Sequence, residues 1–280
     1  MAPLVRPMTR ADLDVAADWA AAEGWEPGVG DADAFWAADP GGFWAAEVDG
    51  RMVATLSLVR QGPAFGFVGF YIVEPASRGR GIGLALWRAV VDASPIPVLG
   101  LDGVPDQQDN YARSGFTFAY GTARYAGLPA DLGDAASDPD IVDALSLPWE
   151  RLVAFDAAHR PAPAPAFLEP WLCGPGRRAL ALVQGGTLRG YGGLRPTEHG
   201  HRVGPLLADA PDVAARLLRA LAAAADGRIG IDVPLANAPA VALAEGLGLV
   251  PSFETARMYR GGDPDLPVGD IYGVTSLELG

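Results

Sequence analysis

The chain has 280 residues, a length that accommodates two ordinary domains or one large one. Half of the residues are hydrophobic and a fifth are charged, which excludes a disordered tail or a fibrous repeat. The net charge of -13 gives a field that repels phosphate, so we expect neither nucleic acid nor an anionic membrane as a partner.

The first half alternates strands and helices. Thr9 is a good N-cap for an Ala-rich helix that Gly24 ends, and Asp49-Gly50 is typical of a tight hairpin turn. After Gly24 we expect a loop rich in Trp, Gly and Asp. The predicted strands cover residues 4–8, 43–48, 52–60, 65–73, 98–101 and 116–125, and the predicted helices cover 10–23, a segment from Ile82 to about Val90, and 110–113.

A change of composition near residues 128–139 indicates a domain boundary. We therefore predict one domain over 1–128, a linker over 129–139 and a second domain over 140–280. The proline-rich segment 160–170 is expected to be an extended connector. The sequence does not place the tail 270–280, for which an edge strand is one alternative. The predicted helices of the second half are 149–158, 211–225 and 238–245, and its predicted strands are 179–183, 188–194, 202–207, 228–233 and 253–259.

Residue types bear on the compartment and on metals. No stretch reaches the roughly 18 apolar residues that span a bilayer. The single cysteine, Cys173, excludes an internal disulfide. His199 and His201 lack visible partners for a metal, so exposed hairpin histidines are the better interpretation. We expect a cytoplasmic protein without a metal.

The most informative segment lies between a predicted strand and a predicted helix. It reads Val73-Glu-Pro-Ala-Ser-Arg78-Gly-Arg80-Gly-Ile-Gly83. Glycines let the main chain approach a ligand, the amides converge, and the helix dipole favours an anion. Arg78 and Arg80 add local positive charge, so the segment predicts a pyrophosphate site.

This segment resembles the acyl-CoA loop of the GNAT superfamily of N-acetyltransferases, because Arg78-Gly-Arg-Gly81-Ile-Gly83 fits its Arg/Gln-x-x-Gly-x-Gly/Ala pattern. A second motif, Tyr111-Ala-Arg-Ser-Gly115-Phe116, resembles the family's Tyr-x-x-x-Gly-Phe. The resemblance implies an α/β fold with two GNAT-like domains, each a mixed sheet splayed between its fourth and fifth strands and flanked by helices.

The resemblance also implies a cofactor position. Acetyl-CoA would lie in the opening, with pantetheine paired to Ile72 and Val73. Tyr111 would protonate the leaving thiolate, a role that suits a phenol at neutral pH. The family's asparagine seven residues earlier is Val104 here, so pantetheine contacts would have to come from elsewhere. The pyrophosphate would take the amides of Arg78, Gly79, Arg80, Gly81, Ile82 and Gly83.

The acceptor is expected to be a small-molecule amine, which must lose a proton before it attacks a thioester. Asp102 leaves a buried strand at the edge of the predicted opening and is the first candidate base, and Glu74 is the second. Acidic and aromatic residues near the first-helix loop are candidates for contacting the acceptor. These residues are Glu23, Trp25, Glu26, Asp31 and Tyr71.

The second half lacks this chemistry. Alignment of the two helices places Asp209 at Arg78, Asp212 at Gly81 and Ala214 at Gly83. Ala244 stands where Tyr111 would be. We therefore predict a second GNAT-like domain without its own catalysis that supports or walls the acceptor site.

Three readings of the function remain open. The first is acetyl transfer to a small amine, or to a peptide or protein amino group. The second is a CoA-binding sensor or scaffold without catalysis. The third is O-acyl transfer or a longer acyl donor.

Overall fold

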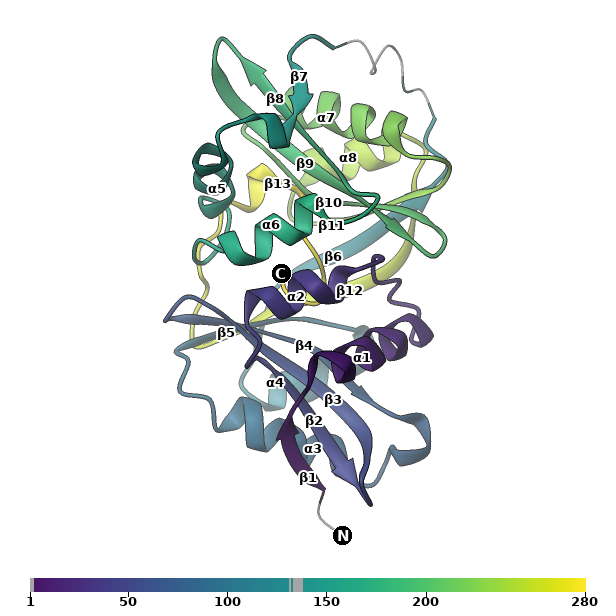
Figure 1. The fold of residues 1–280 in the computed structure, drawn as a ribbon, viewed down its shortest axis with the longest axis vertical. Helices are drawn as coiled ribbons and strands as arrows, with labels where there is room; N and C mark the ends of the chain where they lie inside the picture. Colours follow the sequence, from purple (N-terminus) through teal and green to yellow (C-terminus); the bar gives the residue numbers. More distant parts are fainter. Residues whose placement is uncertain (1–2, 131, 133–137) are drawn as a thin grey trace.

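The computed structural model describes residues 3–130, 132 and 138–280, and residues 3–130 form six strands and four α-helices (Figure 1). Thr9 and Asp12 form a reciprocal capping box at the first helix, as the sequence predicts for Thr9. A π-helical turn, Arg88–Asp92, extends the third helix. The elements are β1 Leu4–Pro7, α1 Arg10–Ala22, α2 Asp31–Ala38, β2 Phe43–Val48, β3 Arg51–Gln61, β4 Phe65–Val73, α3 Ile82–Trp87, β5 Val98–Gly103, α4 Gln108–Arg113 and β6 Thr117–Gly127.

The second half repeats this order. The predicted linker 129–139 lies partly outside the described residues, and the short strand β7 follows it. The elements are β7 Ile141–Asp143, α5 Trp149–Ala157, α6 Pro165–Cys173, β8 Arg178–Gln184, β9 Thr187–Thr197, β10 Gly200–Ala208, α7 Pro211–Ala224, β11 Ile229–Pro234, α8 Ala238–Gly246, β12 Val250–Arg260 and β13 Ile271–Gly273.

Two helices correct the sequence-based expectations. The loop expected after Gly24 contains α2, and the connector expected over 160–170 contains the start of α6. Pro165 stands at the first turn of α6, where a missing N–H costs no helical hydrogen bond. The two helices pack on each other between the halves, and this tertiary contact outweighs their weak local signals (Figure 1).

All the strands belong to one mixed sheet. The order along it is β1-β2-β3-β4-β5-β12-β6-β11-β10-β9-β8-β7, with β13 paired to β10. Strand β12 of the second half lies between β5 and β6 of the first, and β6 pairs with β11 of the second. The halves therefore exchange strands, and the sheet runs continuously through the middle of the molecule (Figure 1).

The sheet opens at two places. Parallel β4 and β5 pair from Phe65–Val98 to Val68–Leu101 and then diverge, which confirms the expected splay. Parallel β10 and β11 likewise pair from His201–Ile229 to Val203–Ile231. There the opening is filled, because β13 pairs with β10 at Leu206 and Leu207.

The tail, which the sequence did not place and for which an edge strand was one alternative, does not lie at an edge of the sheet. β13 lies inside the second opening, whereas the path of the sheet ends at β1 and β7. Asn237 holds this segment in place: its Nδ2 lies 3.2, 2.9 and 3.0 Å from the carbonyl oxygens of Val268, Gly269 and Ile271. The tail is thus part of the interior.

Candidate active site

The loop between β4 and α3 has the backbone that the glycine pattern predicts. Gly79 and Gly81 adopt φ of 73° and 74°, values that favour glycine. A Cβ on Gly83 would lie 2.8 Å from the Tyr71 hydroxyl and 2.9 Å from a Val73 methyl. Each glycine thus meets a conformational or steric requirement of this turn.

The loop presents amides and positive charge at the start of α3. The first helical bond runs from Ala85 N to Gly81 O at 3.0 Å, so the amides of the first turn precede the helical ladder. Arg78 donates from Nε to Val73 O at 2.9 Å and also contacts the Glu23 carboxylate. The Arg80 side chain is exposed. This arrangement suits a phosphate group.

A cavity of about 740 Å³ lies beside this loop. One wall is the end of β4 with the glycine loop, another is the β5–α4 loop, and the aromatic rings of Trp25 and Phe253 complete the lining. Phe253 comes from β12, a contribution that the sequence did not indicate. Of the predicted site residues, the cavity brings together Glu23, Trp25, Tyr71, Ile72, Val73, Arg78, Gly79, Gly81, Ile82 and Gly83.

Tyr111 is not among the residues that line this cavity, but it is connected to the lining residue Tyr71 through the ring of Trp87. The Tyr111 ring packs 5.5 Å from Trp87, whose ring lies 5.3 Å from that of Tyr71. Burial, with a smaller contribution from Tyr71, raises the pKa of the Tyr111 phenol. The phenol therefore keeps its proton at neutral pH, as a general acid must.

Asp102 does not fit the role of a free base. Its two carboxylate oxygens each accept a hydrogen bond of 2.8 Å from Arg257, and its side chain is 0% exposed. Burial raises its pKa, while Arg257 opposes that shift. The sequence missed this pair because nothing local shows that β12 inserts beside β5.

Glu74 is also engaged elsewhere. Its carboxylate lies 2.5 Å from Arg51 Nη1, and the Ser77 hydroxyl donates to it at 3.2 Å. The hydrogen bond from Arg51 lowers the pKa of Glu74. The residue therefore anchors the end of β4 to β3 instead of facing an acceptor.

The predicted acceptor-contacting acids Glu26 and Asp31 bind the second half. Glu26 pairs with Arg202 at 2.9 Å, and Asp31 pairs with Arg177 at 2.9 Å and Arg195 at 3.1 Å. These ion pairs fasten the α1–α2 loop across the interface. The two carboxylates therefore stabilise the loop that forms a wall of the site and are not free to bind an acceptor.

The loop has a further anchor at Trp25. Arg124 donates to the Trp25 carbonyl oxygen at 2.8 Å and lies 5.2 Å over the Phe253 ring. Asp232 accepts a hydrogen bond from Arg124 Nε at 2.7 Å. This pairing offsets part of the desolvation free energy of the two buried charges. Arg124 of β6, held by Asp232 of the second half, thus contacts two of the aromatic residues of the cavity, Trp25 and Phe253.

The counterpart region of the second half has different contacts. Asp209, which aligns with Arg78, pairs with Arg189 at 2.5 Å. Asn237 caps α8 by accepting from Ala240 N at 3.2 Å. Carboxylates and the inserted β13 therefore stand where the first half has glycines and an open cavity.

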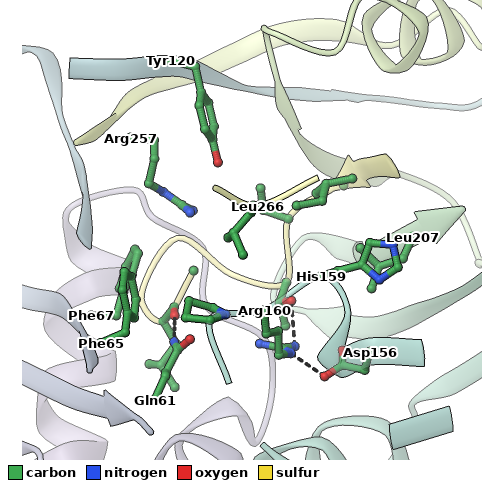
Figure 2. Close-up of a pocket in the computed structure, with 17 residues that line it drawn as sticks. Gln61, Phe65, Phe67, Tyr120, Asp156, His159, Arg160, Leu207, Arg257 and Leu266 are labelled. Carbon is green, nitrogen blue, oxygen red and sulfur yellow. Dashed lines mark hydrogen bonds and ion pairs between the residues drawn. The ribbon is translucent and has the colours of Figure 1, made fainter. Parts of the chain in front are cut away.

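A second cavity lies between the halves (Figure 2). Arg257 lies 5.0 Å over the Phe67 ring on one side of it, and Arg160 pairs with Asp156 at 2.5 Å on another. The tail residues Leu279 and Gly280 also line this cavity. This cavity shares no lining residue with the cavity beside the glycine loop.

Other expectations concern metals and membranes. His199 is exposed, whereas His201 on β10 is half-buried. Within residues 3–130, 132 and 138–280, no three His, Cys, Asp or Glu side chains are grouped as metal ligands would be. The helices of the same residues include none with the length and apolar character required to traverse a bilayer.

Family models match both halves of the chain. The model of the acetyltransferase (GNAT) family matches residues 11–96, and that of an acetyltransferase (GNAT) domain matches residues 152–273. The holothin acyltransferase of Pseudoalteromonas sp. (strain SANK 73390) is 32% identical over 277 residues, which is 98% of this chain and 94% of that protein.

Solved structures share the fold. A protein from Pyrococcus horikoshii that is assigned as an acetyltransferase has a TM-score of 0.84 at 20% identity, covering 100% of this chain and 96% of its own. A tandem GNAT protein from the clavulanic acid biosynthesis pathway has a TM-score of 0.63 at 19% identity, covering 93% of this chain and 99% of its own. The second of these structures is itself described as a tandem GNAT protein.

Proposed function

Because the chain belongs to the GNAT family of acyltransferases, we propose that it transfers an acetyl group from acetyl-CoA to the primary amine of a small molecule. The observation that carries this proposal is the glycine and arginine loop at the open splay of β4 and β5, beside a cavity of about 740 Å³. An open groove that ends in a phosphate site suits a long nucleotide thioester.

The proposed cofactor pose uses main-chain groups of the first half. The pyrophosphate binds the amides between Arg78 and Gly83, and Arg80 adds charge. Pantetheine runs back along Val73 and Ile72, so the thioester points toward the place where β4 and β5 join. Tyr111 donates its proton to the sulfur as the carbon–sulfur bond breaks.

The acceptor attacks the thioester directly, in a ternary complex. Trp25 and Phe253 supply flat apolar surface to the cavity, which suits a small organic amine more than an extended peptide. The related holothin acyltransferase is named for holothin as its acceptor, not for a protein. That relationship supports the same class of acceptor here.

Calorimetry with acetyl-CoA and an assay of CoA release test the proposal together. The amine probes are 2-phenylethylamine, tryptamine, spermidine and glycinamide, with a lysine-containing peptide as the macromolecular alternative. We expect binding of acetyl-CoA and turnover with at least one small amine. Binding without turnover of any amine would favour the sensor, and turnover of the peptide alone would contradict the small-molecule acceptor.

A further inference from the structure

A row of buried polar side chains crosses the sheet on the face between the two halves. On the exchanged strands, Thr122 of β6 and Thr255 of β12 are directly opposite each other. They are 1% and 5% exposed, and neither hydroxyl has a hydrogen-bond partner among the described residues. An unpaired buried hydroxyl costs free energy, so such a pair indicates a place where a polar ligand binds.

The arginines on either side of this pair are already neutralised. Arg257 is bound by Asp102 and Arg124 by Asp232, as described above. Ser57 of β3 adds a third buried, unpaired hydroxyl, 3.0 Å from the position that a Cβ of Gly69 would take. Ser57 lies beside the point where β4 and β5 separate, and Thr255 is the residue of β12 just beyond its last pair with β5, Ala256–Gly103, with Thr122 next to it on β6.

The tail carries a carboxylate to the same point. Val274 N donates to Asp232 O at 2.9 Å, and Gln61 Nε2 donates to Leu279 O at 2.5 Å, so the segment is held at both ends. Between them, the carbonyl of Glu278 packs on Gly69, where it leaves no room for a Cβ. Gly69 is the first residue of β4 beyond its last pair with β5, Val68–Leu101.

The Glu278 side chain is 5% exposed and forms no ion pair within the described part of the chain. Asp31, Arg195 and Arg124 face it. Burial raises the pKa of Glu278, Asp31 raises it further, and the two arginines oppose the shift. Because Arg195 binds Asp31 and Arg124 binds Asp232, neither arginine is committed to Glu278.

We propose that Glu278 is the catalytic base that deprotonates the amine, with the hydroxyls of Ser57, Thr122 and Thr255 binding the acceptor beside it. This assignment rests on the proposed function. In the proposed pose the acyl end of the cofactor points along β4 toward Gly69, and Glu278 lies there on the face opposite α3 and α4. A base positioned across the strand from the thioester faces the attacking amine rather than the leaving thiolate.

The protons balance in this scheme. The ammonium group gives one proton to the Glu278 carboxylate, and the neutral nitrogen attacks the thioester carbon. As the carbon–sulfur bond breaks, Tyr111 protonates the thiolate and then regains the remaining extra proton of the new amide nitrogen. Glu278 releases its proton to water, so ammonium and thioester yield amide, thiol and one proton.

Glu278→Gln in the full chain tests the assignment, with Glu198→Gln as the matched control, since Glu198 lies exposed on the β9–β10 hairpin. The assay uses the panel amine with the highest wild-type turnover. We expect kcat/KM at pH 7 to fall about 100-fold in Glu278→Gln, with the calorimetric Kd for acetyl-CoA unchanged. The defect shrinks as the pH approaches the amine pKa of about 10, because solution then removes the proton.

A second variant keeps the carboxylate. Glu278→Asp is expected to retain part of the activity and the loss of activity at acidic pH that protonation of a carboxylate produces. If Glu278→Gln kept turnover within threefold of wild type, or if Glu278→Asp lost as much activity as Glu278→Gln, the assignment of Glu278 as the base would be overturned. The proposed function would remain. A wild-type chain that acetylates no amine would overturn the proposed function and this assignment with it.

Discussion

The two openings in the sheet begin alike and end differently. Each starts where two parallel strands stop pairing, β4 from β5 and β10 from β11. The first continues into a cavity beside a glycine loop, and the second holds β13 of the same chain. The comparison teaches that the splayed sheet provides space, while the loop and the tail determine what occupies it.

The largest expected effect comes from reversing the charge of the loop. The double variant Arg78→Glu, Arg80→Glu replaces two guanidinium groups with carboxylates, and the second half already has a carboxylate, Asp209, at the position of Arg78. We expect the Kd for acetyl-CoA to rise about 100-fold or more, since each charge-assisted contact contributes about 1.5–3 kcal/mol. Calorimetry measures this Kd, and Arg88→Glu, at an exposed position of the same helix, is the control. Unchanged affinity in the double variant would show that the loop is not the phosphate site.

Tyr111→Phe removes the phenol that acts as the acid in the first half. The second half already lacks an acid at this position, where it has Ala244. We expect kcat to fall about 100-fold while the Kd for acetyl-CoA stays the same. Burial raises the pKa of this phenol above its ordinary 10.0, so the wild-type enzyme should keep its acid protonated and lose no activity through Tyr111 below that pH. Equal turnover by the variant in steady-state assays would remove Tyr111 from the acid role.

Two glycine-to-alanine substitutions test how the tail is packed, one at Gly69 of β4, which the tail contacts at Glu278, and one at Gly273 in β13. Alanine at Gly69 would collide with the main-chain carbonyl of Glu278, whereas alanine at Gly273 would meet the Ile231 side chain at 2.9 Å, which can rotate. We expect Gly69→Ala to cost about 2–3 kcal/mol of stability and Gly273→Ala about 1 kcal/mol. Thermal unfolding compares the two, and the reverse order would contradict this placement of the tail.

A similarly small effect on stability, and none on cofactor binding, is expected at Asn237, which ties the tail to α8. Asn237→Ala removes the N-cap and the donor to three tail carbonyls, so we expect a loss of about 1–2 kcal/mol and a Tm lower by a few degrees. Affinity for acetyl-CoA should not change, because the filled opening is remote from the glycine loop. A weakened affinity in calorimetry would show that the two openings are coupled.

Sequence reasoning was sufficient where the structure is local. The segment from Val73 to Gly83 joins adjacent elements, and its glycines indicate the backbone that the loop needs, so the loop could be predicted from its residues. The splay beside it was expected only from the resemblance to the family. The partners of Asp102 and Glu26 could not be, because Arg257 and Arg202 are distant in sequence and reach them only through strand exchange and packing of the halves. α6 was missed because prolines hid the helical spacing of its buried residues.

The exchange of β6 and β12 makes the protein a single cooperative unit despite its repeated pattern. A fragment that ended after β6 would leave β5 and β6 with unpaired strand edges, because β12 separates them in the sheet. It would also leave Asp102 without Arg257, an uncompensated charge in an apolar interior. Neither half can be transplanted as a module, and unfolding should proceed in one transition.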